Sequence, residues 1–229
     1  MFYVLSKLKL NVLGDIGCYT LGAVTPLNAI DSVICMGASI GMAIGFDKAE
    51  EGAYKNTVAV IGDSTFIHSG ITGLIDAVYN KARVTVIIVD NRTTGMTGHQ
   101  DHPATGRTIK KEPTYPLSLE EVCKAVGVRR IEVVDPDDVQ NVERVVKEEL
   151  AAEEVSVIIA RKPCVLLTKK LYDGFRVDPE KCKNCKMCMR LGCPAIINGE
   201  HGVTIDVSLC TECGLCRNIC KFGAIGEAK

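Results

Sequence analysis

The chain has 229 residues, and its 27 Lys and Arg are balanced by 28 Asp and Glu. This length allows one large and one small domain, and a net charge near zero gives no reason to expect nucleic acid or an anionic membrane as the main partner. Residues 33–46 form the longest weakly polar stretch, which is too short for a membrane span of about twenty residues. The N-terminus also lacks a secretory signal, so we expect a cytoplasmic protein.

Short apolar runs alternate with helical patterns through most of the chain. Predicted strands lie at residues 57–62, 84–91, 130–135 and 155–160. Predicted helices lie at residues 69–82, 118–128 and 135–150, and the small residues of 36–45 predict a further, tightly packed helix. Ser118 and Glu121 form a capping box for one helix, and Pro136 suits the first turn of another. This order predicts an α/β fold, a parallel sheet with helices on both faces.

The composition changes after residue 168. Residues 169–178 are polar and contain Gly and Pro, so we expect a linker there between a first domain, residues 1–168, and a second domain, residues 179–229. The second part is an internal duplication. Each half joins a short apolar strand pattern to three closely spaced cysteines and a fourth cysteine. This pattern predicts a small α+β domain.

Cysteines are concentrated in this duplication, which holds eight of the twelve in the chain. Disulfide-rich chains are usually small and secreted, so the distribution favours metal binding in a reducing compartment. The other four cysteines, Cys18, Cys35, Cys123 and Cys164, are scattered through the apolar body. We expect them to be small buried hydrophobic side chains.

The two cysteine runs, "CKNCKMCMRLGCP" and "CTECGLCRNIC", share the spacing C-x2-C-x2-C. Three such cysteines surround one corner of an iron–sulfur cubane, and the fourth cysteine of each run normally binds the other cluster. This rule assigns cluster one to Cys182, Cys185, Cys188 and Cys220, and cluster two to Cys210, Cys213, Cys216 and Cys193. Zinc ribbons also use C-x2-C pairs, but two triads do not suit tetrahedral pairs of pairs. The runs resemble bacterial two-cluster ferredoxins, which implies two 4Fe-4S centres.

Two positions depart from the ferredoxin pattern. Lys221 stands where the pattern has proline, and four residues rather than three separate Cys188 from Cys193. Gly192 could absorb the extra residue in a longer loop. We expect Cys193 to be the least secure ligand, and its loss would leave cluster two labile or with three irons.

Polar residues follow two consecutive predicted strands. Gly62 and Asp63 end one strand and precede a helix, and Asn91 ends the next strand. Ligands of parallel sheets bind at this edge, where a helix N-terminus favours phosphate. A carboxylate, an amide oxygen and a backbone carbonyl would suit Mg²⁺, with a diphosphate completing the octahedron. The alternative is that Asp63 only caps the helix.

Several motifs occur in an order that one enzyme family shares. They are "GDIGCYTLG", "CMGASIG", "GDSTFIHSGI", "DNRTTGMTGHQDHPATG" and "RKPCVL", followed by the two cysteine runs. Together they resemble the alpha subunits of indolepyruvate ferredoxin oxidoreductases, which belong to the 2-oxoacid:ferredoxin oxidoreductases. The resemblance implies oxidative decarboxylation of an aryl pyruvate by thiamine diphosphate, with coenzyme A as acyl acceptor and ferredoxin as electron acceptor.

The resemblance also implies roles for individual residues. The ligands of Mg²⁺ would be Asp63, Asn91 and the carbonyl of Thr93. The diphosphate would be bordered by Gly62, Ser64, Thr65 and Gly95, with Met96 beside them. Other parts of the cofactor would meet Asp15, Gly17, Cys18, Tyr19, Met36 and Gly37. The candidate catalytic residues near the substrate are His68, His99 and His102, although a loop or surface role stays open for each.

In this family a glutamate on a separate pyrimidine-binding domain activates the cofactor. We therefore expect a partner domain or subunit that carries this glutamate, together with a beta subunit, in a hetero-oligomer. We expect the chain to be inactive alone, whether it is a split subunit or a fragment. Two other interpretations stay open. One is an electron-transfer iron–sulfur protein with a non-catalytic thiamine-fold scaffold, and the other is a non-oxidative thiamine decarboxylase subunit, which would not explain the cysteine tail.

Overall fold

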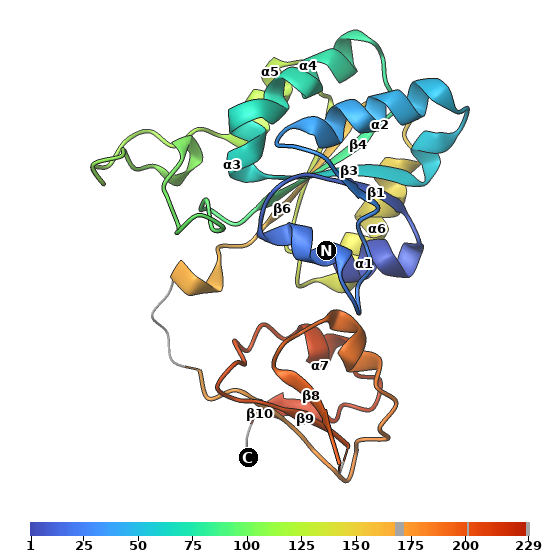
Figure 1. The fold of residues 1–229 in the computed structure, drawn as a ribbon, viewed down its shortest axis with the longest axis vertical. Helices are drawn as coiled ribbons and strands as arrows, with labels where there is room; N and C mark the ends of the chain where they lie inside the picture. The colour runs from blue at the N-terminus through green and yellow to red at the C-terminus, as the bar shows by residue number, and fades with distance from the viewer. Residues whose placement is uncertain (168–171, 201, 228–229) are drawn as a thin grey trace.

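The first domain is built on six parallel strands in the order β2-β1-β3-β4-β6-β5 (Figure 1). The computed structural model describes residues 1–167, 172–200 and 202–227. The strands are β1 (Asn11–Gly14), β2 (Ser32–Val33), β3 (Thr57–Gly62), β4 (Thr85–Asp90), β5 (Arg130–Val134) and β6 (Ser156–Arg161). The predicted parallel sheet is confirmed, and β3, β4, β5 and β6 correspond to the four predicted strands.

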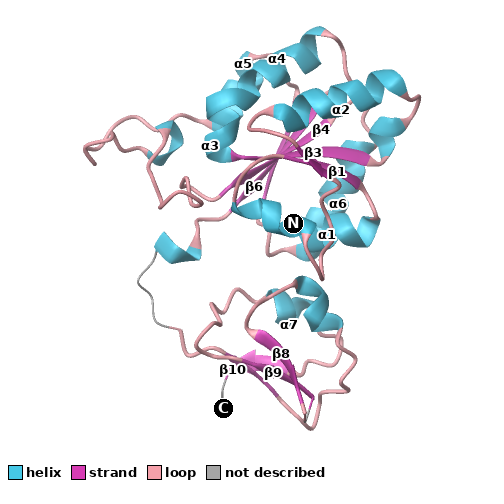
Figure 2. Cartoon of the chain, in the orientation of Figure 1, coloured by secondary structure: helices cyan, strands magenta, loops and turns pink. Residues whose placement is uncertain are grey.

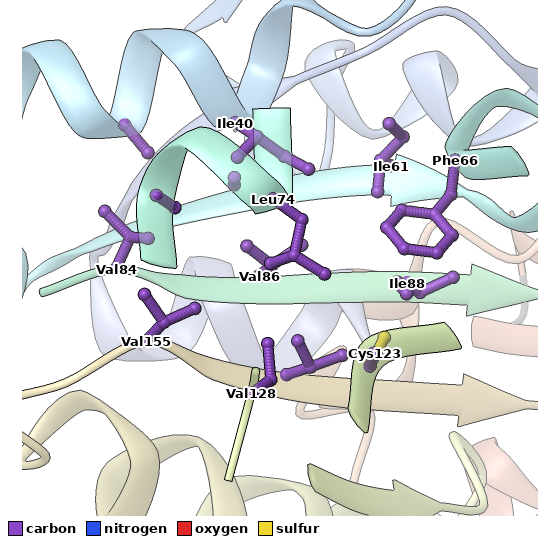
Figure 3. Close-up of a cluster of buried hydrophobic side chains, with 14 of the residues drawn as sticks. Ile40, Ile61, Phe66, Leu74, Val84, Val86, Ile88, Cys123, Val128 and Val155 are labelled. Atoms are coloured by element: carbon purple, nitrogen blue, oxygen red, sulfur yellow. The ribbon is translucent and has the colours of Figure 1, made fainter. Parts of the chain in front are cut away.

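Helices cover both faces of this sheet, as predicted. One face carries α2 (Ala38–Ala49), α4 (Ile71–Tyr79) and α5 (Leu119–Ala125), and the other carries α1 (Phe2–Leu8) and α6 (Val139–Leu150). The first face buries Ile61, Phe66 and Leu74 (Figure 3). Because side chains alternate along a strand, Val58 and Val60 of β3 are buried on the opposite face. Burial on both faces explains why these strands are almost continuously apolar.

Of the four scattered cysteines, only Cys123 is buried as expected. It lies in the core of the first face (Figure 3), and burial raises the pKa of its thiol to about 12. Cys18 and Cys35 are exposed, and Cys164 is half-buried. These three lie in loops or short helical turns at the edge of the sheet, where the apolar composition of the surrounding sequence does not lead to burial.

The capping box marked the start of α5 correctly, whereas the prediction that Pro136 starts a helix was wrong. Ser118 Oγ accepts a hydrogen bond from the Glu121 amide at 3.2 Å. Helix α6 begins only at Val139, and the side chain of Asp138 accepts from the Asn141 amide at 3.0 Å. Pro136 lies in the preceding turn because Asp138 supplies the N-cap.

The second domain contains two small antiparallel sheets and two short helices. Strand β7 (Phe175–Val177) pairs with β10 (Ile225–Glu227), and β8 (Ile196–Gly199) pairs with β9 (Gly202–Ile205). The helices are η6 (Met187–Leu191) and α7 (Leu215–Ile219). Their apolar core includes Phe175, Ile196, Val203 and Ile225. The predicted α+β character of this domain is confirmed.

The predicted linker, residues 169–178, falls partly on residues 169–171, which lie outside the described residues. Residue 168, the predicted end of the first domain, lies outside them as well. Among the described residues of this segment, Phe175–Val177 forms β7 and contributes to the core of the second domain. A strand of three residues gives too short a pattern to be recognised in the sequence.

The segment between β4 and α5 is a long loop that projects from the sheet (Figure 2). Its only helical element among the described residues is the short turn η4 (Pro103–Thr105). Loops at the edge of a rigid sheet often carry functional residues. In the parts of the chain that the structure describes, no helix is sufficiently long and apolar to span a membrane.

Buried charges join β4, β6 and α5. Asp90, at the end of β4, is only 1% exposed, and its carboxylate accepts a hydrogen bond from Arg161 Nε at 2.6 Å. Arg161 also donates two hydrogen bonds to Glu120 of α5, at 2.7 and 3.1 Å. Burial raises the pKa of Asp90, whereas the bonds from Arg161 lower the pKa of Glu120 to about 2. This network ties the end of β6 to the start of α5, where the projecting loop ends.

Replacing Arg161 with Met should destabilise the fold by about 3 kcal/mol, because the buried Asp90 carboxylate would lose its main partner. Arg92 Nε, 3.3 Å from Asp90, would remain as a weaker one. Urea denaturation of variant and wild type measures the difference. The control Arg144→Met breaks an exposed pair on α6 and should change stability by less than about 0.5 kcal/mol. An equally small change for Arg161→Met would contradict the role of the network.

Candidate functional site

A cavity of about 110 Å³ lies at the carboxyl ends of β3 and β4. Its lining comes mainly from the turn after β1, the start of the helix after β3, and the loop after β4. The lining residues are Ile16, Gly17, Cys18, Tyr19, Met36, Gly62, Asp63, Ser64, Thr65, Val89, Asn91, Thr93, Thr94, Gly95, Met96 and Thr97. The fold thus brings together all the residues expected at the cofactor except Asp15 and Gly37.

Four residues of the lining were missed in the sequence. They are Ile16, Val89, Thr94 and Thr97. Each lies within two positions of an expected residue, and none carries a side chain that by itself indicates binding. Their closeness to the motifs was the only signal that could have identified them.

Asp63 joins the ends of two strands within this cavity. It is 2% exposed, and both carboxylate oxygens accept backbone hydrogen bonds. Oδ1 accepts from the Ser64 amide at 2.8 Å, and Oδ2 accepts from the Arg92 amide at 3.0 Å. Ser64 follows β3 and Arg92 follows β4, so one carboxylate fixes both loops. Each oxygen keeps a further lone pair, so Asp63 can still bind a cation.

Two further hydrogen bonds hold the loop after β4, one within the loop and one to the helix after β3. Asn91 Oδ1 accepts from the Thr93 amide at 3.0 Å, which forms a tight turn. Thr94 Oγ1 donates to Ser64 Oγ at 2.8 Å and connects this loop to the helix after β3. As a result, Asp63, Asn91 and Thr93 border one cavity.

The segment after β3 is helical without interruption to the end of α4. It comprises α3 (Asp63–Thr65), the π-helical turn η3 (Phe66–Gly70) and α4, and the backbone is right-handed at both junctions. Ser64 and Thr65 at its N-terminus line the cavity. Free amides and the helix dipole at such an end favour an anion. The arrangement therefore fits a ligand that carries phosphate.

Tyr19 forms one side of the cavity and explains two of the glycines around it. Its hydroxyl donates to the Ile16 carbonyl at 3.2 Å, and burial raises its pKa well above the ordinary value. A Cβ atom on Gly62 would lie 2.9 Å from the tyrosine ring, and a Cβ atom on Gly17 would also collide with it. Any larger residue at either position would displace Tyr19.

Asp15 and Gly37, although expected at the cofactor, support the site from outside the cavity. Asp15 is fully buried, and its carboxylate accepts from the amides of Gly37 at 2.9 Å and Ser39 at 3.2 Å. These amides belong to the start of α2, so Asp15 stabilises that helix end. Gly37 has a φ of 88°, and a Cβ atom there would lie 2.8 Å from Ser69 Oγ. Both residues position α2 instead of lining the cavity.

The three candidate histidines lie in different environments, and none lines the cavity. His68 is exposed, and His99 is half-buried with a φ of 61°. His102 is buried, and its Nε2 lies 3.1 Å from Asp63 Oδ2 without the alignment of a hydrogen bond. Its Nδ1 accepts from the Ala104 amide at 3.4 Å, which places the proton on Nε2. Of the three histidines, His102 is the one that contacts a polar residue of the cavity.

The cavity is smaller than a complete cofactor site. Pockets for small molecules usually measure about 300–1,000 Å³, so about 110 Å³ provides room for only one part of a cofactor. Met36 and Met96 line the cavity and are 45% and 55% exposed. Exposed apolar side chains at a concave site are typical of a surface that binds another protein or a ligand.

A second, largely apolar cavity lies in the second domain. Its lining includes the four cysteines assigned to cluster one, Cys182, Cys185, Cys188 and Cys220. Three come from the first run and one comes from the second, as the interlocking rule requires. Burial raises the pKa of the Cys188 thiol, and the nearby thiols of the other three raise it further.

The cysteines assigned to cluster two also lie close together. Burial raises the pKa of the Cys216 thiol to about 11, and the neighbouring thiols of Cys213, Cys193 and Cys210 raise it further. Gly192 has a φ of 67° and a ψ of 24°, a left-handed conformation that glycine adopts readily. This turn accommodates the extra residue before Cys193, so the unusual spacing still brings Cys193 to the other three.

Each thiolate of a cubane binds a different iron, so the sulfurs surround the cluster and do not converge on one ion. In the described ranges, no group of three or more His, Cys, Asp or Glu side chains could hold a single metal ion. The set of Asp63, Asn91 and Thr93 is of another kind, because only one of its three members is acidic.

Comparison with protein families defines the class of protein. The family described as "Thiamine pyrophosphate enzyme, C-terminal TPP binding domain" matches residues 15–160, which include the cavity and most of the sheet. The family described as "4Fe-4S binding domain" matches residues 203–226. The chain therefore belongs to the thiamine pyrophosphate enzyme family and carries an iron–sulfur domain.

Curated proteins are similar to nearly the whole of this chain. The "Indolepyruvate oxidoreductase subunit IorA" of Archaeoglobus fulgidus is 42% identical over 221 residues, and that of Pyrococcus horikoshii is 39% identical over 236 residues. Each alignment covers 94% of this chain, but only 35% and 36% of the relatives. The chain thus spans about a third of the length of these relatives. The resemblance inferred from the motifs is confirmed.

A solved structure supports the fold. The 2-oxoglutarate:ferredoxin oxidoreductase from Magnetococcus marinus aligns with a TM-score of 0.58 and 15% sequence identity, over 71% of this chain and 58% of that chain. At this identity the likeness concerns the fold alone. It agrees with the parallel sheet covered by helices on both faces.

The interlocked cysteines predict a pattern of iron loss. Cys185→Ala and Cys220→Ala should each remove about half of the iron, although the two residues belong to different runs. The variant with both changes should lose no more than either single variant, whereas Cys213→Ala with Cys220→Ala should lose nearly all. Iron analysis after anaerobic reconstitution measures this. Additive losses for Cys185→Ala and Cys220→Ala would contradict the assignment.

His102 should strengthen metal binding, because its Nε2 lies 3.1 Å from Asp63 Oδ2 and can orient the carboxylate once a metal binds. His102→Asn keeps an acceptor for the Ala104 amide but removes Nε2, so we expect about tenfold weaker metal binding. His102→Gln can place an amide N–H near Asp63 and should recover most of the affinity. Titration of Mn²⁺ with thiamine diphosphate, followed by electron paramagnetic resonance of free Mn²⁺, measures both. Wild-type affinity in His102→Asn would show that His102 has no role at the metal.

Proposed function

We propose that this chain is part of a thiamine diphosphate-dependent 2-oxoacid:ferredoxin oxidoreductase. The proposed reaction is oxidative decarboxylation of indolepyruvate or a related aryl pyruvate with coenzyme A, which yields an aryl-acetyl-CoA, carbon dioxide, a proton and two electrons. The electrons would pass through two 4Fe-4S clusters to ferredoxin. The observation that carries the proposal is that one chain combines the Asp63 cavity with two interlocked sets of four cysteines.

The donor atoms of the cavity fit Mg²⁺. They are the Asp63 carboxylate, the Asn91 side-chain oxygen and the Thr93 carbonyl, and this cation prefers such hard oxygen ligands. Diphosphate oxygens and water would complete its octahedron. Two backbone hydrogen bonds already orient the Asp63 carboxylate, so little rearrangement would accompany metal binding.

The same edge of the sheet fits a diphosphate. The helix that begins at Asp63 places its positive end at the cavity, which would offset part of the phosphate charge. Ser64 and Thr94 bring hydroxyl groups to the same place. The polar end of the cofactor would therefore bind on this chain, in agreement with the small volume of the cavity.

Thiamine diphosphate, when bound, stabilises the negative charge that decarboxylation leaves on a 2-oxoacid. The residues of this chain would hold its diphosphate and metal. Tyr19, Met36 and Met96 would restrict the access of water, which would otherwise protonate the reacting carbon. The cysteines would hold the iron–sulfur clusters that take electrons one at a time. A non-oxidative decarboxylase has no use for such clusters, so the tail favours oxidation.

A partner would complete the site. The cavity accommodates only part of the cofactor, exposed Met36 and Met96 border it, and the chain spans about a third of the IorA relatives. A pyrimidine-binding domain that carries an activating glutamate would cover this side, and a beta subunit would complete a hetero-oligomer. The preference for an aryl pyruvate rests on the names of the IorA relatives.

The cofactor proposal predicts a strong effect at Asp63. Asp63→Asn should weaken binding of thiamine diphosphate with Mg²⁺ by about 100-fold or more, because the only acidic ligand of the metal is lost. Isothermal titration of the chain together with its pyrimidine-domain partner measures this, and chelation of Mg²⁺ should have a similar effect on wild type. The control Asp76→Asn removes the same charge from the exposed surface of α4 and should bind normally.

This titration also distinguishes the thiamine-dependent enzyme from an electron-transfer protein without a cofactor site. An electron-transfer protein with a non-catalytic scaffold would bind no thiamine diphosphate, or would bind it equally well after the change Asp63→Asn. Once binding is established, assays of the reconstituted complex with aryl and alkyl 2-oxoacids under low oxygen test the substrate. We expect coenzyme A-dependent ferredoxin reduction with indolepyruvate, and higher activity with an alkyl 2-oxoacid would contradict the aryl preference.

A further inference from the structure

Exposed lysines lie next to the cysteines assigned to cluster one. Lys183 and Lys186 line the cavity that its four cysteines form, and Lys221 directly follows Cys220. All three lysines are exposed. We refer to Lys183, Lys186 and Lys221 as the lysine collar. Lys221 is also the residue that replaces the proline of the ferredoxin pattern.

The collar has no acidic partner among the described residues of this chain. The neighbouring Lys181 pairs with Asp178 at 3.2 Å, but within the described ranges no ion pair involves Lys183, Lys186 or Lys221. Lys183 and Lys186 line one cavity, so their unpaired positive charges repel each other, and Lys221 adds a further positive charge next to the ligand Cys220. An acidic partner would relieve this repulsion, so the charge is available for association.

The two cysteine runs differ in charge although both form the same kind of site. Residues 182–190 contain three basic residues and no acidic one, whereas the corresponding nine residues, 210–218, contain one acidic and one basic residue. The acidic residue, Glu212, accepts a hydrogen bond from the Gly174 amide at 2.8 Å. Holding a cubane therefore does not require the lysines, which indicates a separate role for the collar.

Phe222 adds an apolar centre to this surface. It lines the cluster-one cavity and is 45% exposed. Cys185, another residue of the lining, is exposed as well, so one edge of cluster one would lie near the surface. An exposed aromatic side chain with charges around it is typical of a protein interface. A partner docked on Phe222 would bring its own centre close to cluster one.

Cluster two adjoins the first domain instead. A Cβ atom on Gly192, next to the cluster-two ligand Cys193, would lie 3.4 Å from Leu27 Cγ. Asn218, which lies midway between Cys216 and Cys220, donates to the Asp137 carbonyl at 3.4 Å and joins the two domains without favouring either cluster. Among the described residues, the collar forms no hydrogen bond or ion pair with the first domain. The two clusters therefore differ in what they face.

We propose that the lysine collar is the docking surface for an acidic one-electron carrier protein, and that electrons leave this chain through cluster one. In each transfer, one electron passes from reduced cluster one to the oxidised iron–sulfur centre of the carrier, and no atom is transferred. This proposal rests on the proposed function, because it requires cluster one to be present. It adds the exit cluster and the surface that the carrier contacts.

Cross-linking tests the surface on the full chain with both clusters reconstituted. The probe is an acidic bacterial two-cluster ferredoxin, coupled with a carbodiimide that joins carboxylates directly to lysines. Mass spectrometry should find links at Lys183, Lys186 or Lys221, and these links should decrease as salt rises. Links found only at lysines of the first domain would overturn the proposal.

Charge reversal tests the route of the electrons. Lys183→Glu/Lys186→Glu, first reduced with dithionite, should reduce the acidic ferredoxin about tenfold more slowly than wild type at low ionic strength. It should reduce cytochrome c, a basic acceptor, faster than wild type. Lys9→Glu/Lys110→Glu makes the same charge change on the first domain and should alter both rates less than about twofold. An unchanged ferredoxin rate, or equal slowing with both acceptors, would overturn the proposal.

Iron analysis distinguishes failure of the docking surface from failure of the proposed function. If wild type holds about four irons instead of about eight and Cys185→Ala loses none of them, cluster one is absent, and this part of the proposed function fails. If wild type holds about eight irons but charge reversal in the collar leaves the rate of ferredoxin reduction unchanged, only the docking surface is overturned. If Lys183→Glu/Lys186→Glu binds less iron than wild type, Lys221→Glu, which lies outside the cavity lining, replaces it with the same directions expected.

Discussion

Two parallel strands that end side by side, and the carboxylate that joins their ends, determine the site of the first domain. β3 and β4 pair in register up to Gly62, so the residues that follow both strands emerge at the same edge. Asp63 then accepts amide hydrogen bonds from Ser64 and Arg92. Without this link the loop after β4 would not be held beside the helix after β3. The oxygen donors of Asn91 and Thr93 would then no longer border one cavity with Asp63.

Buried aspartates recur at the carboxyl ends of neighbouring strands. Asp15 follows β1 and holds the start of α2, Asp63 follows β3, and Asp90 ends β4 and pairs with Arg161. A buried carboxylate is costly unless its oxygens are satisfied, and each of these is satisfied by backbone amides or arginine. The cost of burial is thus offset by bonds that fix the loops, which leaves the cavity edge rigid while its outer rim stays exposed.

The two halves of the second domain share their cysteine pattern but differ in charge and in their contacts with the first domain. In the proposed arrangement, each half would contribute three cysteines to one cluster and one cysteine to the other, so neither half could complete a cluster alone. Charge is not duplicated. The collar lies beside the cysteines assigned to cluster one, while Gly192, next to Cys193, packs against Leu27 of the first domain. Under the proposed electron route, an approximately symmetric domain would acquire a direction, with one cluster facing the source of electrons and the other facing their acceptor.

The sequence by itself determined the fold class, four strands of the sheet and the cap of α5, because each depends on local periodicity or spacing. It also contained the motifs that show the family resemblance. It did not reveal β1, β2 and β7, which are too short to show a period, or the start of α6, where Asp138 competed with Pro136. Only the tertiary structure decided that Asp15 lies behind the cavity and His102 next to Asp63, and that Arg161 and Glu120 enclose Asp90. Those contacts join residues far apart in the chain, and no local pattern encodes which distant side chains meet.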